Sequence, residues 1–157
     1  MAQTLLLLQE KGLTDEDALN QRIEELSTRF HESSDVAKDL EDRMKANKEL
    51  RYNVAVYTST KKAAQQLKTA KQPAAFENQH RAELTAYRAA AAYFKANSIT
   101  KLPSPKKLEA EYAQLASEKA KFYEQYKEAK EELLKLKTAK QNVASYFREE
   151  EPTQQER

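Results

Sequence analysis

Two histidines, His31 and His80, are the strongest metal-ligand candidates in this sequence of 157 residues, which contains no cysteine. A protein zinc site usually takes three or four ligands at short, regular spacing. Neither histidine belongs to a His-x-His or His-Glu-x-x-His pattern, and His80 shares the apolar face of a predicted helix. We therefore predict packing or surface roles for both histidines, with no metal site and no cofactor.

The eight tyrosines are the other candidates for chemistry, because a tyrosine can act as a covalent nucleophile. Such a tyrosine needs a neighbouring base or metal, and the sequence offers neither. The pairs Ser33–Ser34 and Glu131–Glu132 also lack convergent His or Asp partners. With a single glycine, Gly12, no phosphate-cradling loop can form. These observations predict a chain that is not an enzyme and has no catalytic residue.

Cations gather in the middle of the chain. From Leu50 to Leu108 there are eleven basic residues against Glu77 and Glu83, a net +9, although the whole chain carries only +2. A basic helical surface can neutralise nucleic-acid phosphates without reading bases. An acidic protein partner, or a solvated face with no specific role, would suit the same pattern. The DNA-contact candidates are Arg51, Lys61, Lys62, Lys68, Lys71, Arg81 and Arg88.

The elements that must position these residues are helices. One glycine, four prolines, one third charged residues and 39% hydrophobic residues favour long helices joined by thin apolar seams. We predict an all-α fold, an elongated helical bundle or coiled coil. The predicted helices span about 2–11, 15–71, 74–96 and 105–148, and the second and fourth are the long ones. Gly12 ends the first helix, Thr14 caps the second, and Ser104 caps the fourth.

Heptad-like apolar stripes run along both long helices. The first runs from Leu19 to Met44, where the register slips and a new stripe begins at Leu50. The second runs from Leu108 to Phe147 in alternating steps of four and three. If the helices run up, down and up, the short helix cannot cover both long ones. An exposed stripe, Leu19–Met44 or Leu133–Phe147, would then mediate homodimerisation or docking onto the rest of a larger protein.

The remaining features concern organisation and location. Residues 1–148 are predicted to form a single elongated helical domain, followed by a disordered acidic tail at 149–157. No apolar run approaches the roughly 20 residues that a membrane-spanning helix needs. Together with the absence of cysteine, this favours the cytoplasm.

Three stretches resemble the C-terminal region of bacterial relaxase/mobilisation nucleases of plasmids and integrative elements. They are MAQTLLLLQEKGLTD, FENQHRAELTAYRAAAAYF and KLPSPKKLEAEYAQLASEKAKFYEQYKEAKEELLKLKTAKQNV. The resemblance implies a non-catalytic helical appendage of a DNA-nicking enzyme of conjugation, since the family's catalytic tyrosine and histidine-cluster motifs are absent here. It also implies a bacterial cytoplasmic location, and partners among DNA and the relaxosome or coupling proteins. The alternative is a purely structural coiled-coil scaffold or docking module without a nucleic-acid role.

Overall fold

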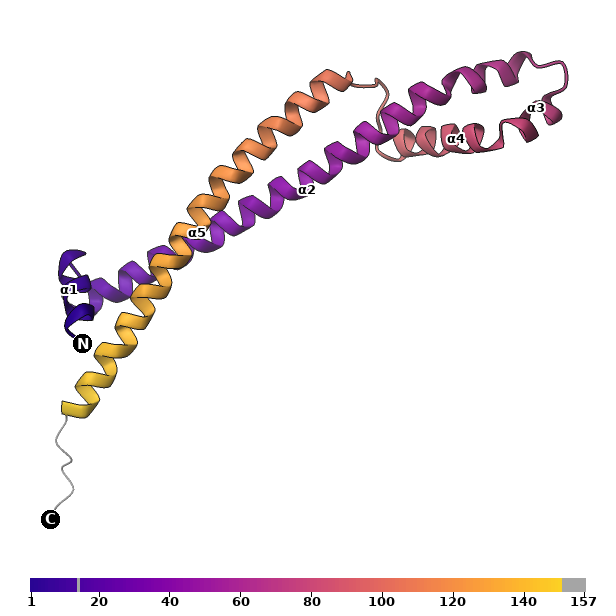
Figure 1. Cartoon of the computed structure of the whole chain (residues 1–157). Coiled ribbons are helices and arrows are strands. Elements are labelled where there is room, and N and C mark those ends of the chain that lie inside the picture. Colours follow the sequence, from indigo (N-terminus) through magenta and orange to yellow (C-terminus); the bar gives the residue numbers. More distant parts are fainter. Residues whose placement is uncertain (14, 151–157) are drawn as a thin grey trace. The chain divides into compact units, whose positions relative to one another are not determined.

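In this computed structural model, which describes residues 1–13 and 15–150, the chain forms five helices (Figure 1). They are α1 (Ala2–Glu10), α2 (Glu16–Thr69), α3 (Pro73–Gln79), α4 (Arg81–Ala96) and α5 (Pro105–Glu150). No strand occurs in the part of the chain that the structure describes. The predicted all-α class is therefore confirmed.

The helix ends follow local chemistry, with one correction. Gly12 has φ +69° and ends α1, as predicted, in a conformation that costs glycine little. The Ser104 hydroxyl accepts the backbone N–H of Lys107 at 3.1 Å, which confirms the predicted cap of α5. At the start of α2, however, the cap is Asp15, whose carboxylate accepts the N–H of Ala18 at 2.7 Å. Thr14, the predicted cap, lies outside the described residues.

The predicted single helix at 74–96 is wrong, because the chain breaks at His80 into α3 and α4. His80 has φ −112° and ψ 25°, away from helical values. The break brings the Glu77 carboxylate within 2.7 Å of the Arg88 guanidinium. In a continuous helix these two residues would lie about 16 Å apart along the axis, so the ion pair depends on the break.

Contacts divide the chain into two compact units. Unit 1 comprises Met1–Asp39 and Lys119–Arg157, and unit 2 comprises Leu40–Glu118. The predicted single domain at 1–148 stays a prediction. The predicted tail at 149–157 begins too early, because α5 continues through Glu150; residues 151–157 lie outside the described part.

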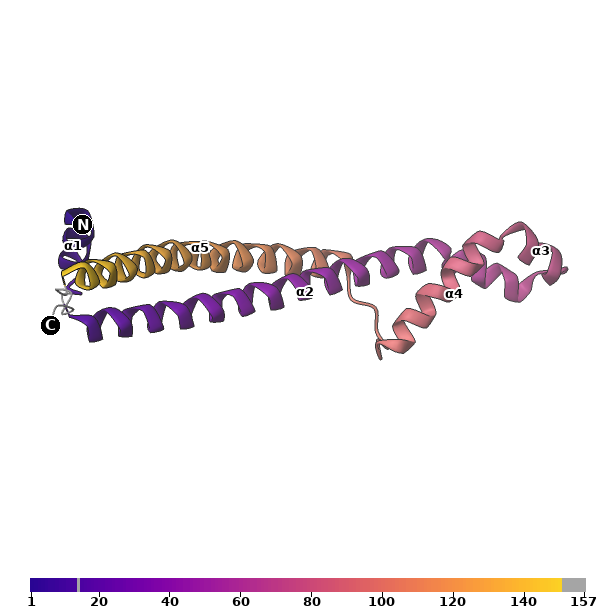
Figure 2. The same cartoon turned by 90° about the horizontal axis from the view of Figure 1, so that it is seen from below.

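Unit 1 is built on an antiparallel pair, the first part of α2 and the last part of α5 (Figure 2). Two contacts give the direction. The Phe30 ring stacks on Tyr126 with centroids 4.7 Å apart, and Arg22 forms an ion pair with Glu132. Arg22 precedes Phe30 on α2, whereas Glu132 follows Tyr126 on α5, so the two helices run in opposite directions. Leu136 of α5 is completely buried in this unit. The core of the unit comprises Leu8, Leu19, Leu26, Leu133, Leu136 and Ala139.

This packing corrects the predicted exposed stripes. Leu19 and Leu26 are 4% and 2% exposed, and Leu133 is 8% exposed. Within unit 1 the described parts of the two predicted stripes, from Leu19 to Leu26 and from Leu133 to Val143, pack against each other. The reason is that α5 runs antiparallel to α2 there, rather than parallel as the up, down and up order assumed. A homodimer through exposed heptad seams therefore loses its structural basis.

Unit 2 is held by the last part of α2, by α3 and α4 turning back along it, and by the start of α5 (Figure 1). Val54, Ala90, Phe94 and Leu108 form its core. The Tyr57 ring stacks on Tyr87 at 5.0 Å and meets Phe94 edge-on at 5.5 Å. In this unit α4 packs on Val54 and Tyr57 of α2, whereas Lys61, Lys62 and Lys68 of α2 are exposed.

The predicted register slip after Met44 stays a prediction. Asn47 lies seven residues after Leu40 and seven before Val54, and all three are buried. Leu50 and Tyr57 of the predicted new stripe also pack against the core of unit 2. The Asn47 amide Nδ2 donates a hydrogen bond to the Leu108 carbonyl at 3.0 Å. Its Oδ1 is buried without a hydrogen-bond partner.

Candidate nucleic-acid interface

All seven predicted DNA-contact residues lie in unit 2. Four lie on α2, Lys71 lies in the turn after it, and Arg81 and Arg88 lie on α4. Unit 2 holds fourteen lysines and arginines against eight acidic residues, a net +6, while the residues of unit 1 sum to −4. The charge asymmetry of the sequence thus follows the division into units.

Two of the seven are already engaged with carboxylates. The Arg51 guanidinium lies 3.6 Å from the Glu109 carboxylate, and Arg88 lies 2.7 Å from that of Glu77. Arg51 also lies over the Tyr112 ring, with its guanidinium carbon 5.7 Å from the centroid. A carboxylate partner offsets the attraction of an arginine for phosphate, so we expect these two residues to contribute less to binding.

The other five side chains are exposed, and within the described residues none of them forms an ion pair. We call Lys61, Lys62, Lys68, Lys71 and Arg81 the unpaired cations.

Their placement follows from the packing of α2. Thr60 and Ala63 are buried, which turns Lys61 and Lys62 outward. Lys61 and Lys68 are one heptad apart, so they share a face of α2 at a separation of about 10 Å along its axis. Lys68 also lies in the last turn of α2, where a cation favours the negative helix end.

A second basic feature, which the sequence patterns did not predict, lies where α2 packs against the start of α5. Lys48 and Arg51 both lie over the Tyr112 ring, with Lys48 Nζ 5.4 Å from the centroid. A hollow of about 410 Å³ is lined by Lys48, Arg51 and the side chain of Tyr52, which is 69% exposed. Only the pairing of α2 with α5 creates this arrangement, although the spacing of Lys48, Arg51 and Tyr52 within one turn of helix was visible in the sequence.

The histidines have packing neighbours. His31 meets Phe30 edge-on at 5.4 Å, and His80 stacks on Phe76 at 4.3 Å. The His80 Nδ1 lies 3.6 Å from the Glu83 carboxylate. Among residues 1–13 and 15–150, no group of three or more His, Cys, Asp or Glu side chains is placed to hold a metal ion. That the chain binds no metal stays a prediction.

Two tyrosines have perturbed acidity. A hydrogen bond with Tyr57, then burial and the Tyr57 charge, raise the pKa of Tyr87. Burial, followed by the charge of Glu49, raises the pKa of Tyr93. A nucleophilic tyrosine reacts as a phenolate, which a raised pKa disfavours. The electrostatics at these two positions therefore do not favour nucleophilic chemistry.

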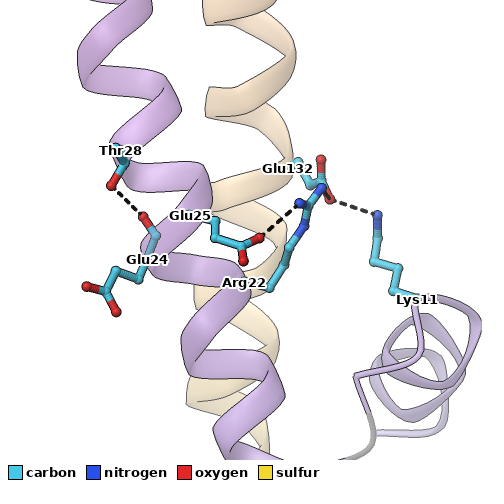
Figure 3. A network of polar contacts seen from close by, with 6 residues as sticks. All are labelled: Lys11, Arg22, Glu24, Glu25, Thr28 and Glu132. Carbon is cyan, nitrogen blue, oxygen red and sulfur yellow. Dashed lines mark hydrogen bonds and ion pairs between the residues drawn. The ribbon is translucent and has the colours of Figure 1, made fainter.

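Glu132, one of the carboxylates considered for chemistry, joins three helices of unit 1 (Figure 3). Its Oε1 lies 3.3 Å both from Lys11 Nζ, just after α1, and from Arg22 on α2. Burial raises the pKa of Glu132, but the hydrogen bonds and charges of Lys11 and Arg22 outweigh it and lower the pKa overall. An ionised carboxylate held by two cations suits a structural junction rather than a general acid.

None of the described helices combines the length and hydropathy needed to cross a membrane. Comparisons with family models, with curated proteins and with solved structures each gave no match.

Proposed function

We propose that this chain is a non-catalytic helical module that holds nucleic acid through its phosphates. The observation that carries the proposal is the stretch from Leu50 to Phe76, which has no carboxylate, and in which Lys61, Lys62 and Lys68 are exposed without an ion pair in the described part. Each cation that neutralises a phosphate releases a condensed counterion, which drives binding without sequence preference. Lysine is well suited to such contacts as a compact point charge.

The wider setting we propose is a bacterial mobilisation relaxase. The three stretches that resemble the C-terminal region of these nucleases support this setting, with the chain acting in the cytoplasm beside a separate catalytic domain. In that setting the module would keep transferred DNA near the nuclease, and relaxosome or coupling proteins would be further partners. The alternating steps of four and three along α5 support a coiled-coil geometry for its helical bundle.

The test is the salt dependence of binding to a duplex oligonucleotide, measured by fluorescence anisotropy with the full chain. We expect log affinity to fall linearly with log salt concentration, with a slope of roughly −0.9 per phosphate neutralised. A variant with Lys61, Lys62, Lys68 and Lys71 changed to glutamine should flatten this slope by as much as about 3.6.

A matched variant controls for net charge. Changing Lys121, Lys127, Lys130 and Lys137 of unit 1 to glutamine removes the same charge from positions that are also exposed. We expect it to leave the slope nearly unchanged. A wild-type slope near zero, or an equal effect of both variants, would reject phosphate contact by the unpaired cations.

A second candidate function, a scaffold or docking module without a nucleic-acid role, is favoured by a different observation. Leu5, Leu6 and Leu134 of unit 1 are 54%, 56% and 65% exposed. Large apolar side chains exposed in number on one unit are a feature of proteins that dock onto a partner. Self-association of the wild-type chain, together with no binding to the duplex oligonucleotide, would support this candidate.

A further inference from the structure

One hollow of unit 2 combines an exposed aromatic ring, a cation and apolar walls. It lies between α2 and the start of α5. Its volume of about 410 Å³ falls within the range of roughly 300–1,000 Å³ that is usual for small-molecule sites. Its apolar walls include Val54 and Leu108, both buried, and its polar lining residues are Lys48, Arg51, Tyr52 and Glu109.

The charges of this hollow leave one cation without a carboxylate partner. The Glu109 carboxylate lies 3.6 Å from the Arg51 guanidinium, so these two charges offset each other. Lys48 is exposed and forms no ion pair within the described residues. Its Nζ lies 5.4 Å from the centroid of the Tyr112 ring, whose face attracts the ammonium group and restricts its position. Lys48 is therefore a positive charge held beside an apolar hollow, where it can contact an anion.

The Tyr52 ring is the aromatic side of the hollow. Tyr52 is 69% exposed and lies four residues after Lys48, on the same face of α2. Tyr57, on the next turns of α2, stacks on another tyrosine ring, whereas Tyr52 stacks on no ring in the described part of the chain. A free aromatic face beside a cation is the arrangement with which proteins stack an unpaired base and hold its phosphate.

From these observations we infer that the hollow takes one base of a single-stranded nucleic acid, which stacks on Tyr52 while Lys48 contacts a neighbouring phosphate. In a duplex, both faces of a base are covered by the adjacent bases, so only an unpaired base can reach the ring. The contact does not select a particular base, because every base has a flat π-face. The inference deepens the proposed function and rests on it for the phosphate contacts elsewhere on α2.

The hollow and the unpaired cations share one side of α2. Lys48, Ala55 and Lys62 follow one another at intervals of seven residues, so they lie close to one face of this helix. Ala55 lines the hollow, and Lys62 is one of the unpaired cations. Lys48 and Lys62 are about 21 Å apart along the helix axis. A strand with one base in the hollow can therefore continue along α2 to Lys62.

The test compares three oligonucleotides of one length, each titrated with the full chain and followed by fluorescence anisotropy. They are a single strand, the matching duplex, and a single strand of abasic sites, which keeps the phosphates but has no bases. We expect the normal single strand to bind at least about fivefold more tightly than the abasic strand, because the stacking of one base contributes at least that factor.

Variants of Tyr52 assign this preference to the hollow. Tyr52→Ala should remove it and leave the affinity for the duplex unchanged, whereas Tyr52→Phe, which keeps the ring, should behave like the wild type. Tyr123→Ala is the matched control, because Tyr123 is a 58% exposed tyrosine of unit 1 that does not line the hollow. Circular dichroism should show wild-type helicity for all three variants.

Two results would overturn the inference: equal affinity of the wild type for the normal and the abasic strand, or equal losses in Tyr52→Ala and Tyr123→Ala. Failure of the proposed function is a separate result, a duplex salt slope near zero. Lys48→Gln adds a second readout, since it should flatten the slope measured with the single strand by about 0.7, the value for one phosphate. An unchanged slope would contradict the phosphate contact assigned to Lys48.

Discussion

Replacing Asn47 with leucine should stabilise the protein, although it removes a hydrogen bond. The Asn47 side chain is 6% exposed, donates one bond to the Leu108 carbonyl at 3.0 Å, and keeps its Oδ1 buried without a partner. Loss of the hydrogen bond lowers the free energy of unfolding by about 1 kcal/mol. Removal of the buried oxygen that has no partner raises it by about 1–3 kcal/mol. Burying a leucine at this position adds about 2 kcal/mol, part of which imperfect packing offsets.

The expected net effect is about 2 kcal/mol in favour of the folded state. It corresponds to a rise in Tm of about 4–8 °C for a chain of this length. Urea unfolding followed by circular dichroism at 222 nm would measure the change in free energy of unfolding, with thermal melts as a second readout.

Two further variants test whether the effect is specific to Asn47. Asn53→Leu is the matched control, since Asn53 lies on the same helix but bonds only to the Glu49 carbonyl of its own helix. It should change stability by less than about 0.5 kcal/mol. Asn47→Asp replaces the donor with a charge at a buried position and should destabilise by more than about 3 kcal/mol. Destabilisation by Asn47→Leu, or tolerance of Asn47→Asp, would refute the explanation that Asn47 is a buried amide with only one of its polar atoms hydrogen-bonded.

Three predictions concern unit 1. Because the pKa of Glu132 is lowered on folding, its contribution is present above the ordinary glutamate pKa of 4.5 and is lost as pH falls through the folded value; Glu132→Gln should therefore cost roughly 1 kcal/mol at pH 7. Urea titrations at several pH values should show the difference shrinking below about pH 4.5, and a constant difference would contradict the ion-pair role. Leu136→Ala should cost about 2–5 kcal/mol, because the side chain is 0% exposed. Leu134→Ala, at a 65% exposed position two residues away, should cost under about 0.5 kcal/mol, and similar costs would mean that the helix is rotated. Gly12→Ala meets no atom within 4 Å but must adopt φ +69°, so we expect a loss of about 1 kcal/mol, read out as faster amide hydrogen exchange in α1; unchanged exchange would show that the turn relaxes.

Features that depend on neighbours along the chain were predictable from the residues. The all-helical class followed from composition, the end of α1 followed from Gly12, and the cap of α5 followed from Ser104. Each of these features depends on interactions within about one turn of helix, which the order of residues specifies directly.

Features that depend on which helix meets which were not predictable in the same way. The direction of α5 in unit 1 decided that Leu26 and Leu133 cover each other instead of facing solvent. The break at His80 accompanies the ion pair between Glu77 and Arg88, which is invisible in a helical pattern.

Asn47 shows the boundary between the two kinds of information. Its position seven residues after Leu40 was present in the sequence, but nothing there indicated that a polar residue would be buried. Only the approach of Leu108, sixty-one residues later, supplies the acceptor that makes the buried position tolerable. The sequence by itself determined that the chain is helical, where α1 ends and where α5 begins, because hydrogen bonding within a helix is local. Tertiary structure decided which helix surfaces are buried, because burial depends on partners that are distant along the chain.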